Sequence, residues 1–431
     1  MQGEGRGHLT QAVAVAAWLR ARGHEVVRVL VGQSARRAVP RFAQDELGAP
    51  VELFPSPNFV ADRMGAVRLG ATIARNARAA DTFAPALRLF DHYVAADRAD
   101  VVVNFYEGLA GLWAATRRAR PPVVAVAHQF MFLHPAYGHV RGRPLHRAAV
   151  LAHTRLAGAG AAVRLALSLY GAPSVPGRRL RVVPPVLRPA ALALRPAPAD
   201  DGSLLVYLVE PALADGLRAW ARRHPEVAIH CFWDGPPSVY GTSLRFHALD
   251  GAHFLRRMAL CRGVVCTAGF ESVSEAMLLG KPVLMVPVPK HYEQACNALD
   301  AAAVGAGLSA RSLEEGLDRF LTYLPTYRPP EGFRPWVESA EAMVLDAIER
   351  AAGAGPPRYV YYRLGGRLYR FEGAPAAHGD GGPRWTELWC GDVWEATPDG
   401  GAVAADGVPV SAEEATREVA ADAPSPRSRR G

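Results

Sequence analysis

The stretch that most constrains the fold of this 431-residue chain is residues 263–286. The apolar run 263–266 predicts a short buried strand, and apolar residues at helical spacing over 270–279 predict a helix. Gly280 can end that helix in a left-handed conformation, and a second apolar strand is expected at 283–286. A strand, a tight turn, a helix and a second strand form the repeating unit of a parallel α/β sheet.

The turn in this unit is suited to bind a phosphate. Thr267-Ala268-Gly269 leads into the helix, whose first backbone N–H groups and positive dipole end point at one spot. One turn further on, the carboxylate of Glu275 could accept hydrogen bonds from ribose hydroxyls. After the second strand, compact polar side chains suited to sugar hydroxyls follow at 293, 294 and 297.

This stretch resembles the donor-binding signature of GT-B nucleotide-sugar glycosyltransferases, which include plant secondary-product enzymes and the bacterial peptidoglycan N-acetylglucosaminyltransferase. The plant signature reads H-C-G-W-N-S-x-x-E, then G-x-P, a proline and D/E-Q-x-x-N. This chain has TAGFESVSE, then GKP, Pro287 and EQACN. It departs from the signature at Thr267, where the family has histidine, and by two extra residues before Glu293. By resemblance, the donor-binding residues are Thr267, Ala268, Gly269, Phe270, Ser272, Glu275, Lys290, Glu293, Gln294 and Asn297.

A second motif lies at the start of the chain, where residues 3–8 read GEGRGH. The pattern differs from a dinucleotide fingerprint, because histidine stands where the last glycine belongs. It resembles the G-x-G-H loop of GT-B enzymes, in which a histidine deprotonates the acceptor hydroxyl. His8 is therefore the candidate general base, and the alternative is a helix cap or simple acceptor contact. The acceptor-side residues of this motif are Gly5, Gly7 and Gln11.

Only two residues precede this loop, although a glycine loop that opens a helix usually follows a buried strand. We expect either that the true start lies upstream of Met1 or that the first strand is missing.

Polar residues also follow two buried strands of the first half. Glu107 comes after the strand expected at 100–105, and His128-Gln129 follows the one at 122–127. Ligands of open α/β sheets bind at the carboxyl ends of the strands, so these side chains should share a cleft with His8. Glu107 is a second catalytic candidate, able to orient His8, and His128 and Gln129 are acceptor-side candidates.

The predicted fold is α/β, with two doubly wound parallel sheets (Rossmann-like domains of GT-B type) and a small C-terminal β appendage. We place an acceptor-side domain at 1–185, a proline-rich linker at 186–202 and a donor-binding domain at 203–353. An aromatic β-rich appendage follows at 356–410, with a hairpin at 358–371 and a further strand segment at 385–395. Residues 411–431 are expected to be disordered. A long helical region at 61–96 suits packing on the sheet, an acceptor site or a membrane-touching face.

Composition narrows the remaining classes. The net charge is +8. Of the 49 basic residues, two are lysines, Lys281 and Lys290, and 47 are arginines. These basic residues are dispersed along the chain, which argues against nucleic-acid binding. No apolar run reaches the length of a membrane span. Five scattered cysteines fit a reducing cytoplasm and not a metal site. We expect a bacterial, cytoplasmic protein without metal or cofactor, whose positive charge leaves open peripheral contact with the inner face of the membrane.

The predicted function is transfer of a sugar from a nucleotide-diphosphate donor, UDP by resemblance, to an acceptor hydroxyl with inversion, as in a hexosyltransferase. The acceptor, lipid-linked or small, is unknown. One alternative is a UDP-sugar 2-epimerase, which shares the fold and needs no acceptor. Another is a non-catalytic sugar-nucleotide-binding protein. A NAD-dependent oxidoreductase is disfavoured by the glycine-loop pattern.

Overall fold

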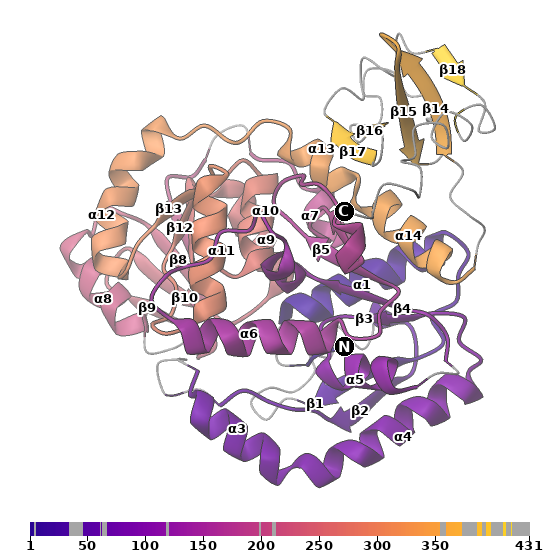
Figure 1. Cartoon of the computed structure of the whole chain (residues 1–431). Helices are drawn as coiled ribbons and strands as arrows, with labels where there is room; N and C mark the ends of the chain where they lie inside the picture. The colour runs from indigo at the N-terminus through magenta and orange to yellow at the C-terminus, as the bar shows by residue number, and fades with distance from the viewer. Residues whose placement is uncertain are drawn as a thin grey trace. The chain divides into compact units, whose positions relative to one another are not determined.

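The computed structural model describes residues 1–3, 6–33, 46–60, 62, 67–117, 120–197, 200–208, 213–353, 359–372, 386–389, 394–397, 408–410 and 415. It divides into two compact units, whose elements are labelled in Figure 1. The first unit holds Met1–Gly171 with Pro176–Ala351, and the second holds Ala172–Val175 with Ala352–Gly431. Both predicted Rossmann-like halves therefore lie in the first unit, and the predicted domain boundaries within it stay predictions.

The strands of the first half are parallel throughout. One pair joins β1 to β2, and a four-stranded sheet runs in the order β3-β4-β5-β6. The bounds are β1 Val29–Gln33, β2 Val51–Pro55, β3 Val102–Asn104, β4 Val123–Ala127, β5 Val163–Leu167 and β6 Leu180–Val183.

Met1 and Gln2 link the two sheets of the first half. Gln2 forms a parallel bridge with Gly32 of β1, whose N–H donates to the Met1 carbonyl at 2.9 Å. The Gln2 N–H donates to the carbonyl of Phe105, just after β3, at 3.1 Å. These two residues therefore occupy the position of a strand between β1 and β3, where the sequence led us to expect a missing one.

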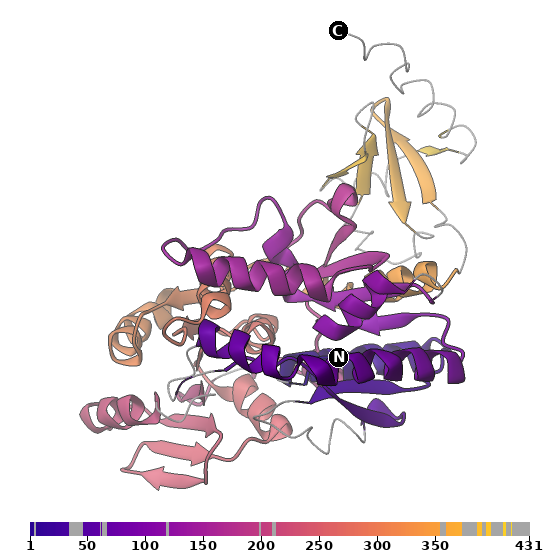
Figure 2. The ribbon, with the colours of Figure 1, turned by 60° about the horizontal axis from the view of Figure 1, so that its bottom comes forward.

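The helices of the first half cover these sheets. They are α1 Arg6–Ala21, α3 Leu69–Arg78, α4 Ala80–Ala96, α5 Gly108–Thr116 and α6 Pro144–Ala157, with a 3-10 turn η1 at His128–Leu133 and another, η2, at Pro176–Arg178. Helices α3 and α4 run along the lower side of Figure 1, which comes forward in Figure 2. The single helical region expected at 61–96 breaks at Ala79, whose backbone is not helical. Helix α4 packs on β2 and α5 through Phe54, Phe90 and Trp113.

The second half holds a seven-stranded sheet in the order β13-β12-β11-β7-β8-β10-β9. All neighbouring pairs are parallel except β10 and β9. The strands are β7 Leu204–Leu208, β8 Ile229–Trp233, β9 Ser238–Tyr240, β10 Leu244–His247, β11 Gly263–Cys266, β12 Val283–Met285 and β13 Gly307–Ser309. The chain builds outward from β7 in one direction and then from β11 in the other. The topological switch point is therefore at β7 and β11, where α/β proteins bind ligands.

The helices of the second half are α7 Pro189–Ala193, α8 Ala214–Arg223, α9 Gly251–Leu260, α10 Phe270–Leu278, α11 Tyr292–Ala303, α12 Leu313–Tyr323, a 3-10 turn η4 at Leu324–Thr326, α13 Phe333–Glu338 and α14 Ala340–Ala351. Helix α7 falls within the stretch predicted as a linker. Helix α14 returns to the first half, where it packs on α1 and β4.

The five strands of the second unit form an antiparallel sheet in the order β17-β16-β15-β14-β18. They are β14 Tyr359–Leu364, β15 Arg367–Glu372, β16 Thr386–Trp389, β17 Trp394–Thr397 and β18 Val408–Val410. The predicted hairpin is confirmed, with both turn glycines at positive φ. The single strand segment expected at 385–395 is wrong: it forms two strands, β16 and β17, in which Trp389 pairs with Trp394. Trp385 and, apart from residue 415, the tail 411–431 lie outside the described residues.

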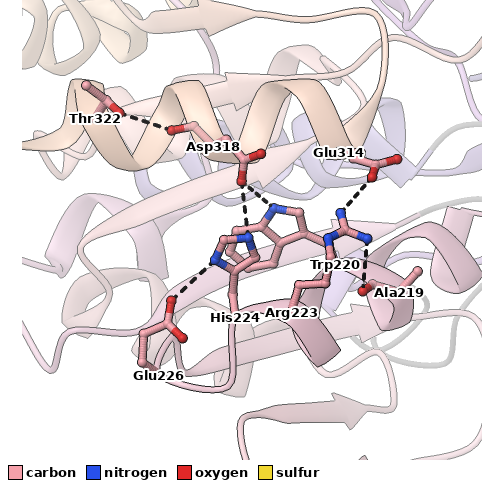
Figure 3. A network of polar contacts seen from close by, with 8 residues as sticks. All are labelled: Ala219, Trp220, Arg223, His224, Glu226, Glu314, Asp318 and Thr322. Atoms are coloured by element: carbon pink, nitrogen blue, oxygen red, sulfur yellow. Dashed lines mark hydrogen bonds and ion pairs between the residues drawn. The ribbon is translucent and has the colours of Figure 1, made fainter.

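A polar network fastens α8 to α12 on the second sheet (Figure 3). The buried Trp220 indole donates to Asp318 at 2.8 Å and stacks on His224, with ring centroids 4.1 Å apart. His224 also pairs with Asp318 at 3.4 Å. Beside this buried contact, Arg223 forms an exposed ion pair with Glu314 at 2.6 Å.

Trp220 should dominate the stability of this network. Trp220→Ala removes a fully buried ring and should lower the free energy of unfolding by about 3–5 kcal/mol. Trp220→Phe keeps the ring packing but loses the indole bond to Asp318, so about 1 kcal/mol is expected. Urea denaturation measures both. Arg223→Ala is the control, since its exposed pair should contribute below about 1 kcal/mol; an equal loss there would contradict the assignment.

Candidate active site

A row of side-chain contacts joins the two halves of the first unit. Donor-side residues of α10 and α11 are bonded to residues of α1, of η1, of the segment between η1 and α6, and of the loop after β5. The pairs are Gln11 with Glu271, Gln129 with Glu293 (2.9 Å), His128 with Asn297 (2.7 Å), His139 with Tyr292 (3.1 Å) and Tyr170 with Asp300 (3.2 Å). The two sets of residues predicted separately to bind donor and acceptor therefore lie against each other.

The turn Thr267-Ala268-Gly269 has the predicted geometry for an anion. Ala268 is buried and takes a left-handed conformation with φ +60°, which is uncommon without glycine. Gly269 is the N-cap of α10, and the first intrahelical bond runs from the Val273 N–H to its carbonyl. The backbone N–H groups of Phe270–Ser272 thus precede the helical ladder and point outward from the helix start. The Ser272 hydroxyl donates to the Gly269 carbonyl at 3.1 Å.

His128 is the centre of the contact between the halves. Its ring stacks on Phe270 with centroids 4.0 Å apart, and its Nε2 lies 2.7 Å from Asn297 Oδ1. Asn297 in turn donates to the Ala268 carbonyl at 3.2 Å, so it also braces the turn. Burial lowers the pKa of His128 to about 4, and the ring is neutral at physiological pH. The acceptor-side prediction for His128 and the donor-side prediction for Asn297 thus meet in one bonded pair.

Glu275 forms an ion pair with Arg188, a residue that the sequence analysis did not single out. Its carboxylate is 3% exposed and accepts a hydrogen bond from Arg188 Nε at 2.8 Å. Arg188 lies in the stretch predicted as a linker, where nothing in the proline-rich pattern marked it. The ion pair places the predicted ribose-binding carboxylate next to a guanidinium.

His8, the predicted general base, lies in the first turn of α1. The ring is buried and stacks on Tyr106 with centroids 5.4 Å apart, and its Nδ1 has no hydrogen-bond partner in the described part of the chain. Burial lowers the pKa of His8 to about 4. The imidazole is therefore neutral near pH 7, which is the form that can accept a proton.

Gly7 and Gln11 bring α1 up to α10. Gln11 Nε2 donates to Glu271 Oε1, and a Cβ atom added at Gly7 would lie 3.0 Å from Glu271 Cγ. Gln11 Oε1 and Glu271 Oε2 are buried without partners among the described residues. Glu271 stands where the signature has asparagine, and the sequence analysis did not single it out as a site residue. Gly5 lies outside the described residues.

Glu107 has a different environment from the one predicted. It is the N-cap of α5, where it accepts from the Leu109 N–H at 3.1 Å and from the Ser56 hydroxyl at 3.0 Å. Burial raises the pKa of this carboxyl. No hydrogen bond joins it to His8 in this part of the structure, so its catalytic role stays a prediction and its visible role is to cap a helix.

The predicted donor residues Lys290, Glu293 and Gln294, which follow β12, differ in their contacts. Glu293 accepts from Gln129 across the halves, as described above. Gln294 braces the preceding loop, because its Oε1 accepts from the Val288 N–H at 2.8 Å. Lys290 is exposed in that loop and has φ +65°.

The described residues also bear on a metal site and on a membrane span. Within the described ranges, no three His, Cys, Asp or Glu side chains are arranged to hold a metal ion. Among the helices of those ranges, none combines the length and apolar character needed to cross a bilayer.

The start of α10 lies at the contact between two halves built on parallel α/β sheets, which is the architecture of a GT-B nucleotide-sugar glycosyltransferase. The profile of glycosyl transferase family 1 matches residues 1–325, and the chain belongs to this family. The predicted family and fold class are thereby confirmed.

Two curated relatives share one name, which states their activity. A UDP-N-acetylglucosamine–N-acetylmuramyl-(pentapeptide) pyrophosphoryl-undecaprenol N-acetylglucosamine transferase of Methylorubrum extorquens (strain PA1) is 28% identical over 367 residues, covering 80% of this chain and 93% of the relative. The protein of the same name from Sphingopyxis alaskensis is 26% identical over 386 residues, covering 81% and 85%.

Solved structures share the fold. The glycotransferase of kitacinnamycin has a TM-score of 0.54 at 16% identity, covering 81% of this chain and 97% of that one. The calicheamicin glycosyltransferase CalG4 has a TM-score of 0.54 at 17% identity, covering 83% and 98%.

Arg188 should be required to hold Glu275 in its buried place. Arg188→Met leaves that carboxylate without its cation, and we expect a loss of about 3 kcal/mol in the free energy of unfolding. A second change, Glu275→Gln, should recover most of the loss by removing the unpaired charge. Urea denaturation of the single and double variants checks this. The exposed pair of Arg319 is the control, where Arg319→Ala should cost below about 1 kcal/mol. A double variant as unstable as Arg188→Met would contradict the pairing.

The carboxyls between the halves predict a pH dependence of stability. Burial raises the pKa of Glu271 to about 8, of Glu293 to about 7 and of Asp300 to about 6. When folding raises the pKa of an acid, the folded protein holds that proton more tightly than the unfolded chain does. The free energy of unfolding therefore falls as pH rises from the unfolded pKa to the folded pKa.

Between pH 7.5 and 8.5 the ligand-free protein should therefore lose thermal stability, chiefly through Glu271. His8 and His128 are neutral in both states over this range, because their pKa is about 4 in the folded protein and 6.5 in the unfolded chain. Glu271→Gln should reduce the drop in Tm, measured by differential scanning calorimetry. A Tm that is constant or rises over this range would contradict the prediction.

Proposed function

We propose that this glycosyltransferase moves a sugar from a UDP-linked donor to an acceptor hydroxyl with inversion, as a hexosyltransferase does. The observation that carries the proposal is a set of buried side-chain atoms with no hydrogen-bond partner in the described part of the chain. They are Gln11 Oε1, Gln129 Oε1 and Glu271 Oε2, on side chains that bond across the two halves, and His8 Nδ1 on α1. Buried polar atoms are seldom left without partners, so this set suits a ligand rich in hydroxyls.

In the proposed reaction, a lone pair of the acceptor oxygen forms a bond to the anomeric carbon as the bond from that carbon to the diphosphate oxygen breaks. The bonding pair leaves with the UDP, and the configuration of the anomeric carbon inverts. His8 Nδ1 takes the proton of the acceptor hydroxyl. The backbone N–H groups at the start of α10, with Ser272, stabilise the charge on the departing diphosphate.

The remaining donor residues support this assignment by position. Glu275, in the middle of α10, would accept hydrogen bonds from ribose hydroxyls, with Arg188 beside it. Glu293 and Asn297 now accept hydrogen bonds from first-half side chains, and sugar hydroxyls could replace Gln129 and His128 as their donors. Peripheral contact with the inner face of the membrane stays a proposal, supported by the net charge of +8 and the lipid-linked acceptor in the relatives' name.

His8 is the residue to test. His8→Ala should lower kcat for sugar transfer by about 10²–10⁴-fold, because a positioned general base contributes that much, while UDP binding stays unchanged. The assay follows UDP release from a panel of UDP-sugars, including UDP-N-acetylglucosamine, with lipid-linked and small hydroxyl acceptors. His24→Ala, an exposed histidine bonded to Glu349, is the matched control.

Two outcomes would overturn the proposal. UDP binding without turnover for any acceptor would favour a binding protein. Conversion of a UDP-sugar to its 2-epimer without an acceptor would favour the epimerase, which the family match does not favour.

A further inference from the structure

Glu271 is a carboxyl placed between two helix starts. It is the second residue of α10, and its side chain reaches across to Gly7 and Gln11 of α1. Gln11 binds one carboxyl oxygen, and the other, Oε2, is buried without a partner in the described ranges. Gln11 is itself 2% exposed with its own amide oxygen unpartnered. The contact between α1 and α10 therefore buries two side-chain oxygens that have no hydrogen-bond partner among the described residues.

The charged groups around Glu271 do not neutralise it. On its own helix it faces Glu275, another carboxylate. Arg188, which precedes α7, is bonded to Glu275 at 2.8 Å, and its charge also acts on Glu271 and Glu46. The rings of His8 on α1 and His128 in η1 are neutral at pH 7 because burial lowers their pKa values to about 4. Among the described side chains, an ionised Glu271 would thus share the Arg188 cation with Glu275 and form no ion pair of its own.

We propose that Glu271 binds the donor as a neutral carboxylic acid, so that a nucleoside diphosphate binds with uptake of one proton at this side chain. The inference rests on the proposed function, which places the diphosphate at the first turn of α10. A carboxylate in that turn would repel the phosphates. A protonated carboxyl can donate its O–H from the unpartnered Oε2 to a phosphate oxygen.

Two observations support a neutral form. Burial raises the pKa of Glu271 to about 8, with Gln11 and Arg188 opposing the rise and Glu275 adding to it. The glycosyltransferase signature has asparagine at this position, a neutral side chain with hydrogen-bond donors. A protonated glutamate offers the same kind of contact, whereas an ionised one does not.

The proton balance sets the direction of the effect. A bound diphosphate disfavours the carboxylate, so it raises the pKa of Glu271 above its ligand-free value near 8. Below about pH 7 the carboxyl is already protonated and binding takes up no proton. Above pH 8 each bound ligand must bring one proton, so affinity falls by up to about tenfold for each pH unit.

The experiment is calorimetric titration of the full chain with UDP at pH values from 7.0 to 9.0, where both phosphates of UDP are ionised. Wild-type Kd should rise several-fold across this range, and the heat should vary with buffer ionisation enthalpy as a proton is taken up. In Glu271→Gln the amide is neutral at every pH, so Kd should stay flat and fall below the wild-type value at pH 9.0. Glu271→Asn, which restores the signature residue, is a second variant in case the first folds poorly.

Asp300→Asn is the matched control, because it removes another carboxyl buried between the halves, one bonded to Tyr170 and remote from α10. It should retain the wild-type pH dependence. UDP that binds wild type equally at all pH values, or a folded Glu271→Gln that keeps the pH dependence or loses UDP binding throughout, would overturn the inference and leave the proposed function standing. A folded protein that binds no UDP at any pH would overturn both.

Discussion

The hydrogen bonds between carboxyls of the second half and neutral donors of the first half are the contacts on which the site depends. Gln11, Gln129 and Tyr170 each bind one carboxyl, at Glu271, Glu293 and Asp300. Burial raises the pKa of every one of these acids, so the contacts hold the halves together while remaining sensitive to protons and ligands. Such contacts are easily exchanged for the hydroxyls of a sugar, because a hydroxyl is also a neutral donor.

The start of α10 links this interface to the proposed chemistry. Ala268 takes a left-handed conformation to aim the helix start, and Asn297 binds its carbonyl while meeting His128 of the opposite half. A displacement of His128 would therefore disturb the hydrogen bonds of Asn297, one of which holds the turn that is proposed to bind the diphosphate. Asn297 and His128 thus connect the turn after β11 to the opposite half through two hydrogen bonds.

Sequence patterns predicted correctly those helices, strands and turns whose signal lies in one short segment, such as an apolar run or a glycine turn. Strand β11, helix α10 and strand β12 appear where the signature stretch placed them, and the glycine pair at 365–366 turns the predicted hairpin. Predictions failed where the outcome depended on contacts remote in sequence. The region 61–96 splits at Ala79, and 385–395 divides into two strands, because packing partners decide such breaks and propensity alone does not.

The sequence by itself determined the family, the α/β class and most residues of the candidate site, because a signature fixes residue types at set spacings along one short segment. The tertiary structure alone decided which of those residues meet. It paired Arg188 with Glu275, turned Glu107 into a helix cap and set Glu271 against Gln11, 260 positions away along the chain. Burial and long-range pairing create the charge environment of a side chain, and neither is encoded in the residues next to it.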